Sequence, residues 1–99
     1  MDLYSNYRGQ RFVWDTEKAS GNLSKHGVSF DQACEVFFDS FLYTQDATDG
    51  DEQREAAIGA TSDLKILFVV HLVRERETIR IISARPATGH ERRQYEDND

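Results

Sequence analysis

The sequence has little cysteine, little proline and no long hydrophobic run. Cys34 is the only cysteine, which excludes an intramolecular disulfide and a zinc site built on clustered cysteines. The longest apolar run, residues 66–73 with His71 inside it, is far shorter than the roughly 20 residues that cross a membrane. The first ten residues show no signal-peptide pattern. We therefore expect a cytoplasmic protein without a membrane span.

Motifs of several enzyme classes are missing as well. There is no glycine-rich phosphate loop, nucleophile elbow or HExxH pattern, and His26, His71 and His90 stand far apart in the sequence. We expect no cofactor and no metal site. A hydrophobic fraction of 38% with 11% aromatic residues is too high for a disordered chain. The length suits one core, so we predict a single domain over residues 1–99.

The net charge of −6 argues against a surface that attracts nucleic acid everywhere. The charge is unevenly spread, however. Residues 46–55 hold five acidic side chains and one arginine, whereas residues 74–93 hold six arginines and three glutamates. Any affinity for nucleic acid should therefore be local and sensitive to salt.

One strand and one helix are predicted close to the N-terminus. Residues 11–14 alternate and include aromatic and β-branched side chains, which favours a short strand. Asp15 is a good N-cap, and Gly27 can take the left-handed conformation that closes a helix. These signals predict the first helix at about 16–26.

A second helix is predicted directly after the first. Ser29 and Gln32 form a capping box. The apolar residues that follow, Cys34 among them, recur at helical spacing and form a stripe that must pack on a flat apolar surface. We therefore expect Cys34 to be a buried structural thiol and not a nucleophile.

The rest of the chain favours an antiparallel meander. Strands are expected at residues 41–44, 54–60, 65–73 and 78–85, and the last three are joined by short polar turns at hairpin spacing. Thr88 and Glu91 form another capping box, which predicts a short third helix up to residue 96. The predicted fold is α+β, with two N-terminal helices packed on an antiparallel β-sheet and a short C-terminal helix.

Arginines on or beside this sheet are the first candidates for chemistry, because together they can bind a phosphodiester. Arg80 lies between isoleucines in an apolar strand, so it is either ion-paired or faces a ligand cleft. Arg85 follows in the same strand and points to the opposite face unless a bulge intervenes. Arg54 opens an earlier strand. Arg92 and Arg93 either contact RNA or are simply exposed to solvent.

Two further groups of side chains allow two interpretations each. His71 titrates near neutral pH and suits general acid or base work, but a histidine in an apolar strand can also be a hydrogen-bonded core residue. Lys18, Asn22 and Lys25 share one polar stripe of the first helix, with His26 beside it. This stripe is either an RNA-contacting face or the solvated side of an amphipathic helix.

Three blocks of sequence resemble the BrnT family of toxins from bacterial toxin-antitoxin pairs. They are FVWDTEKASGNLSKHGVSFDQA at 12–33, EQREAAIG at 52–59 and VVHLVRERETIRIISARPATGHERRQYE at 69–96. The combination is more specific than any one block. Two features depart from the family pattern, Pro86 after the last arginine of the strand and the acidic segment 46–55.

The resemblance implies a fold similar to the RelE group of ribonucleases and cleavage of RNA without a metal, with arrest of translation. It also implies an oligomeric complex with an antitoxin, BrnA, which alone would bind promoter DNA. In this interpretation the RNA 2′-hydroxyl attacks the adjacent phosphate. Arg54, Arg80 and Arg85 would clamp the phosphate, and His71 or His26 would transfer protons. Lys18, Asn22, Lys25, His26, Arg92 and Arg93 would bind RNA.

A hypothesis from another class remains open at this point. The chain could be a non-catalytic module whose arginines hold an acidic partner in a stoichiometric complex. An enzyme predicts turnover of RNA at low protein ratios, whereas a binding module predicts complex formation without turnover.

Overall fold

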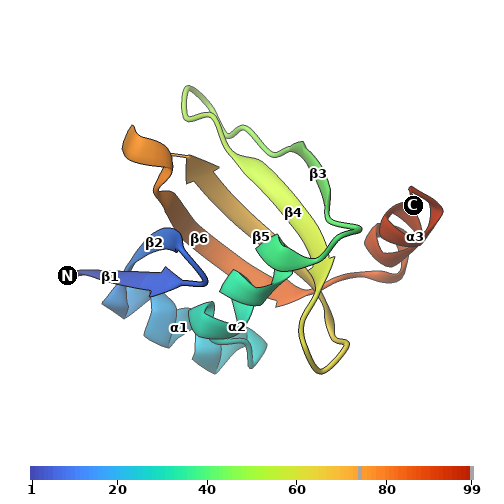
Figure 1. Cartoon of the computed structure of the whole chain (residues 1–99), viewed down its shortest axis with the longest axis horizontal. Helices are drawn as coiled ribbons and strands as arrows, with labels where there is room; N and C mark the ends of the chain where they lie inside the picture. The colour runs from blue at the N-terminus through green and yellow to red at the C-terminus, as the bar shows by residue number, and fades with distance from the viewer. Residues whose placement is uncertain (74, 99) are drawn as a thin grey trace.

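The computed structural model describes residues 1–73 and 75–98, so Arg74 of the basic stretch and Asp99 lie outside the described residues. Within this part of the chain six strands form one sheet, and three α-helices accompany it (Figure 1). The elements are β1 (Asp2–Tyr7), β2 (Gln10–Asp15), α1 (Thr16–His26), α2 (Phe30–Glu35), β3 (Tyr43–Asp46), β4 (Glu55–Ala60), β5 (Ile66–Val73), β6 (Ile79–Pro86) and α3 (Gly89–Asp97). None of these helices is long and apolar enough to cross a membrane.

The strand order in the sheet is β1-β2-β6-β5-β4-β3. Neighbouring strands are antiparallel except β2 and β6, which pair in parallel. The chain leaves β2 through the helices, enters the sheet again at the far edge, and returns through the meander until β6 reaches β2. The prediction of two N-terminal helices on an antiparallel sheet is therefore wrong. The chain begins with a β-hairpin, and the sheet is mixed.

The strand that the sequence analysis missed is β1. It pairs with β2 through a two-residue turn in which Arg8 and Gly9 both have positive φ, 53° and 89°, as the hairpin turn of type I′ requires. The side chain of Asn6 accepts a hydrogen bond from the Gly9 amide. This edge strand is mostly exposed to solvent, so it shows no apolar alternation from which a strand could be predicted.

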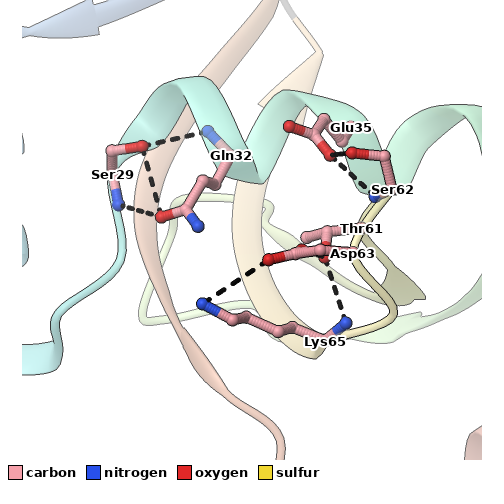
Figure 2. A network of polar contacts seen from close by, with 7 residues as sticks. All are labelled: Ser29, Gln32, Glu35, Thr61, Ser62, Asp63 and Lys65. Carbon is pink, nitrogen blue, oxygen red and sulfur yellow. Dashed lines mark hydrogen bonds and ion pairs between the residues drawn. The ribbon is translucent and has the colours of Figure 1, made fainter.

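Both N-terminal helices are capped as predicted. Asp15 accepts a hydrogen bond from the amide of Lys18, and Gly27 closes α1 with φ 71°. The capping box of Ser29 and Gln32 starts α2 (Figure 2). Cys34 is buried, and burial raises the pKa of its thiol to about 12. The prediction of a buried structural thiol is thus confirmed, and this cysteine is not a reactive nucleophile at neutral pH.

The two faces of the sheet differ in how they are covered. The core lies on one face, where side chains of β2, β4, β5 and β6 pack against α1, α2 and the short 3-10 turn after α2. On the other face α3 covers only the end far from β1 (Figure 1), where its Glu91 pairs with Arg85. The part of this second face near β1 and β2 is left uncovered.

A bulge in β6 decides which side chains share that second face. Val70 pairs with Ser83 but His71 pairs with Ile81, so the register shifts between Val70 and His71. Because of this shift, Ile81 and Ala84 both point into the core, and Arg80 and Arg85 both point to the other face. A bulge was the condition under which the sequence allowed the two arginines to share a face.

Candidate functional site

An open cleft lies on the uncovered face of the sheet, between the β1–β2 hairpin and the segment that precedes β4. Its volume is about 1450 Å³. The side chains around it are mostly polar and come from segments far apart in the sequence: Tyr4, Arg11, Val13, Asp46, Thr48, Asp51, Glu52, Gln53, Arg54, Glu55, Leu72, Val73, Arg76, Thr78 and Arg80. The cleft therefore brings together two of the predicted phosphate-binding arginines, Arg54 and Arg80.

Arg80 is both ion-paired and in the cleft, so the two alternatives left open by the sequence occur together. Its Nη1 and Nη2 donate to the two carboxylate oxygens of Asp2, at 3.1 and 2.6 Å. The hydrogen bonds raise the pKa of Arg80 and lower the pKa of Asp2. The guanidinium is thus fixed by its two outer nitrogens, whereas its buried Nε–H has no hydrogen-bond partner among the described residues.

Arg54 is ion-paired with the acidic segment 46–55, which departs from the family pattern in the sequence. Its Nε donates to Glu52 at 2.7 Å, and its Nη1 lies 4.0 Å from Asp49. The side chain of Arg54 keeps 26% of its surface exposed. The acidic residues therefore hold this arginine in the wall of the cleft, where an incoming anion would have to compete with them.

Arg85 lies on the same face but outside the cleft. Its two terminal nitrogens donate to the Glu91 carboxylate at 2.8 and 2.9 Å, and its guanidinium stacks on Phe68 at 4.2 Å from the ring centre. Five residues along a strand correspond to roughly 15 Å. Arg80 and Arg85 are thus too far apart to bind one phosphate, and Arg85 joins α3 to the sheet.

His71 lies on the helix-covered face and is 3% exposed. Its ring packs edge-on against Phe37, with 4.8 Å between the ring centres, and its Nε2 lies 3.4 Å from Oε1 of Glu55. Burial lowers the pKa of His71 more than the Val69 carbonyl and Glu55 raise it, which favours the neutral ring. The geometry fits the hydrogen-bonded core residue, and His71 meets the cleft only through Glu55.

Asn22, predicted to contact RNA, is a buried structural residue. Its Nδ2 donates to the carbonyl oxygens of Val28 and Ala84 at 3.0 and 2.7 Å, and its Oδ1 accepts from the Ala84 amide at 3.1 Å. The side chain therefore joins α1 to β6 and to the loop after α1. It has no free polar group to offer a ligand, whereas Lys18 and Lys25 on the same helix are exposed.

A smaller hollow of about 380 Å³ lies between the end of α1, the turn between β4 and β5, and α3. Three cationic or titratable side chains, His26, Lys65 and Arg92, line it. Lys65 lies 3.7 Å from Asp63, whereas His26 and Arg92 make no ion pair within the described part of the chain. Arg93 is also exposed on α3. Two of the predicted RNA-binding residues, His26 and Arg92, thus meet at one place.

One wall of this hollow is fixed by polar contacts between α2 and the turn before β5 (Figure 2). Glu35 accepts hydrogen bonds from the amide and the hydroxyl of Ser62, both at 2.8 Å. Lys65 emerges from the same turn beside Asp63. The turn is therefore held against the helix, and the cation of Lys65 is presented from an ordered segment.

Three residues of the N-terminal hairpin, Asp2, Tyr4 and Arg11, were not predicted as site residues from the sequence. Tyr4 is 56% exposed, and the Arg11 guanidinium lies 4.7 Å from its ring centre. The sequence did contain a turn signal, because the run Asn-Tyr-Arg-Gly at 6–9 includes asparagine and glycine, which are both common in turns. Because β1 was not predicted, nothing in the sequence indicated that these side chains would lie close to Arg80 in β6.

Comparison with known protein families matches residues 14–91 to the family described as "Ribonuclease toxin, BrnT, of type II toxin-antitoxin system". The match spans most of the chain and includes the meander, the helices α1 and α2, and Arg54, Arg80 and Arg85. It leaves out β1, residues 10–13 of β2 and most of α3. No curated protein matches the chain. The chain belongs to the BrnT family of ribonuclease toxins of type II toxin-antitoxin systems.

Proposed function

We propose that this toxin is an endoribonuclease that cuts RNA in the cleft beside Arg80 without a metal ion, and so arrests translation. We further propose that it acts in the cytoplasm and is neutralised there by a BrnA-like antitoxin in a hetero-oligomeric complex. In that complex only the antitoxin would contact promoter DNA. The observation that carries the proposal is the meeting of Arg54 and Arg80 in one open cleft.

The reaction needs no nucleophile from the protein. The 2′-oxygen of one nucleotide attacks the adjacent phosphorus, and the bond from phosphorus to the 5′-oxygen of the next nucleotide breaks. The products are a 2′,3′-cyclic phosphate and a free 5′-hydroxyl. The 2′-hydroxyl gives up a proton and the departing 5′-oxygen takes one from solvent. The protein contributes by positioning the reacting atoms and stabilising the extra negative charge.

Arg80 and Arg54 are the proposed phosphate clamps. A phosphate offers the same pair of oxygens as the carboxylates that they now bind, so RNA would replace Asp2 at Arg80 and Glu52 at Arg54. Arginine does not titrate at neutral pH, so it cannot also transfer the proton. Glu55 borders the cleft through its position at the start of β4, but its carboxylate lies with His71 on the helix-covered face. We therefore assign removal of the 2′-proton to solvent.

Replacement of Arg80 by alanine tests the proposal. Loss of a donor that stabilises a developing negative charge typically lowers the rate by about 10²-fold to 10³-fold, so Arg80→Ala should cleave RNA that much more slowly. Arg80→Lys should recover only part of the rate, because lysine cannot bind two oxygens in one plane. The measurement is single-turnover cleavage of a labelled RNA by folded protein in the presence of a chelator.

Arg85→Ala is the matched control. Arg85 lies in the same strand and forms the same bidentate carboxylate pair, but outside the cleft. Its folded variant should cleave within a few-fold of the wild-type rate. The proposal fails if Arg80→Ala keeps the wild-type rate. It also fails if the wild-type protein forms a stoichiometric antitoxin complex but never turns over RNA, which is the behaviour of a binding module.

A further inference from the structure

The N-terminal hairpin carries an exposed aromatic ring into the cleft. Tyr4 is 56% exposed and lines the cleft together with Arg11, whose guanidinium lies over the ring at 4.7 Å from its centre. An arginine at this distance restrains the ring by a cation–π contact. Both residues precede the matched residues 14–91. The family match therefore does not cover them.

The register places this ring beside the proposed phosphate clamp. Tyr4 pairs with Val13, and Val13 pairs with Arg80, so the three residues form one row across neighbouring strands. With strands about 4.8 Å apart, the backbones of Tyr4 and Arg80 are separated by roughly 10 Å, and their side chains share a face. Asp2, two residues before Tyr4, reaches the guanidinium of Arg80. The ring of Tyr4 thus lies next to Arg80, the proposed phosphate clamp.

We propose that Tyr4, restrained by Arg11, is a stacking platform for one unpaired base of single-stranded RNA whose phosphate is bound at Arg80. The inference rests on the proposed function, because it concerns the same cleft and the same substrate. Aromatic rings and guanidinium planes are the surfaces on which proteins stack splayed-out RNA bases. A base within a duplex is already stacked on its neighbours, so the platform selects for single strands.

The chemistry around the ring favours RNA over a protein surface as the occupant. Tyr4 shares the cleft with the cations of Arg11 and Arg80 and with acidic residues of segment 46–55. A base with its phosphate uses the flat ring and, by replacing Asp2 at Arg80, the neighbouring cation at once, whereas an apolar protein segment would use the ring alone.

Binding of a single-stranded RNA that carries 2′-O-methyl groups tests the platform, because it cannot be cleaved by its own 2′-oxygens. Base stacking on an aromatic side chain corresponds to about 5-fold to 150-fold in affinity. Tyr4→Ala should weaken binding by a factor in this range, and Tyr4→Phe should bind like wild type because it keeps the ring. A duplex of the same sequence should bind wild type and Tyr4→Ala equally.

Leu3→Ala is the matched control, since Leu3 is exposed on the same strand but points to the other face. It should leave binding unchanged. KM for cleavage of the unmodified RNA should rise in Tyr4→Ala more than kcat falls. If wild type cleaves RNA but Tyr4→Ala binds it equally well, the platform is refuted and the proposed function stands. The same holds if Tyr4→Ala weakens only the antitoxin complex. If wild type never cleaves RNA, the proposed function itself fails.

Discussion

The cleft and the hollow hold their cations in different ways. In the cleft, Arg54 and Arg80 are each bound by carboxylates of the same chain. In the hollow, Lys65 lies beside Asp63, but Arg92 has no acidic partner among the described residues. An arginine bound at two oxygens has a fixed orientation and little net charge to attract an anion, whereas an unpaired cation attracts from a distance but explores many rotamers. The cleft is thus suited to positioning and the hollow to attraction.

The largest effect is expected from Asn22, which joins α1 to β6 and to the loop after α1. Asn22→Ala would leave the buried amide of Ala84 and the carbonyls of Val28 and Ala84 without their partner. Each buried polar group that loses its partner costs about 1–3 kcal/mol, so the free energy of unfolding should fall by about 3 kcal/mol. The measurement is unfolding by urea. Ser20→Ala, exposed on the same helix, should change stability by less than about 0.5 kcal/mol.

A loss below about 1 kcal/mol in Asn22→Ala would mean that water replaces the side chain and that the end of α1 is not fixed by it. In the expected case, RNA cleavage by the folded fraction should be unchanged, because Asn22 does not line the cleft and contacts β6 on the opposite face. This outcome would separate the structural role seen here from the RNA contact predicted from the sequence.

A smaller effect is expected from Asp2, the carboxylate that occupies Arg80. Asp2→Asn keeps the shape and removes the charge, so RNA should bind about 2-fold to 5-fold more tightly at low salt, and the gain should vanish as salt screens the cleft. Asp31→Asn, exposed on α2, makes the same change in net charge away from the cleft and should have no such effect. Equal affinities for Asp2→Asn and wild type at low salt would show that Asp2 does not compete with RNA.

The pH dependence of this difference follows from the Asp2 pKa. Arg80 lowers that pKa below 3.8, so the carboxylate is charged and the ion pair is present at every pH well above this value. The pair is lost only as the pH falls through the lowered pKa. The difference between Asp2→Asn and wild type should therefore stay constant through neutral and mildly acidic pH, as titrations of RNA binding can check.

The predictions that succeeded rest on local signals. The caps at Asp15, Gly27 and Ser29 depend on residues within a few positions, and the strands of the meander follow from apolar runs bounded by polar turns. The parallel pairing of β2 with β6 joins segments far apart in the chain, and no local pattern encodes it. The polar edge strand β1 has no apolar face to recognise. The fold class was predicted wrongly because of these two features, the parallel pairing of β2 with β6 and the additional strand β1.

Several residues of the candidate site could be predicted from the sequence, but which of them lie together in space could not. Arg80 was singled out because a charge between isoleucines needs a partner, and the structure supplies Asp2 from the strand that was missed. Arg54 and Arg80 meet only through the order of the strands. Arg85 lies on the same face as Arg80 because of the bulge in β6, and it is ion-paired with Glu91. These outcomes depend on strand register, which composition and spacing do not specify.

The smallest effect is expected from Arg92, one cation of the hollow. If the hollow attracts RNA through charge alone, Arg92→Gln should weaken binding about 2-fold to 3-fold and reduce the slope of log affinity against log salt by about 1. Cleavage of bound RNA should keep its rate, because the cleft arginines are untouched. Arg8→Gln removes the same charge from the β1–β2 turn, where the guanidinium lies over Phe38, and should leave the slope unchanged. A slope that changes equally in both variants would mean that RNA senses only the net charge of the molecule, and the distinction between an attracting hollow and a positioning cleft would then fail.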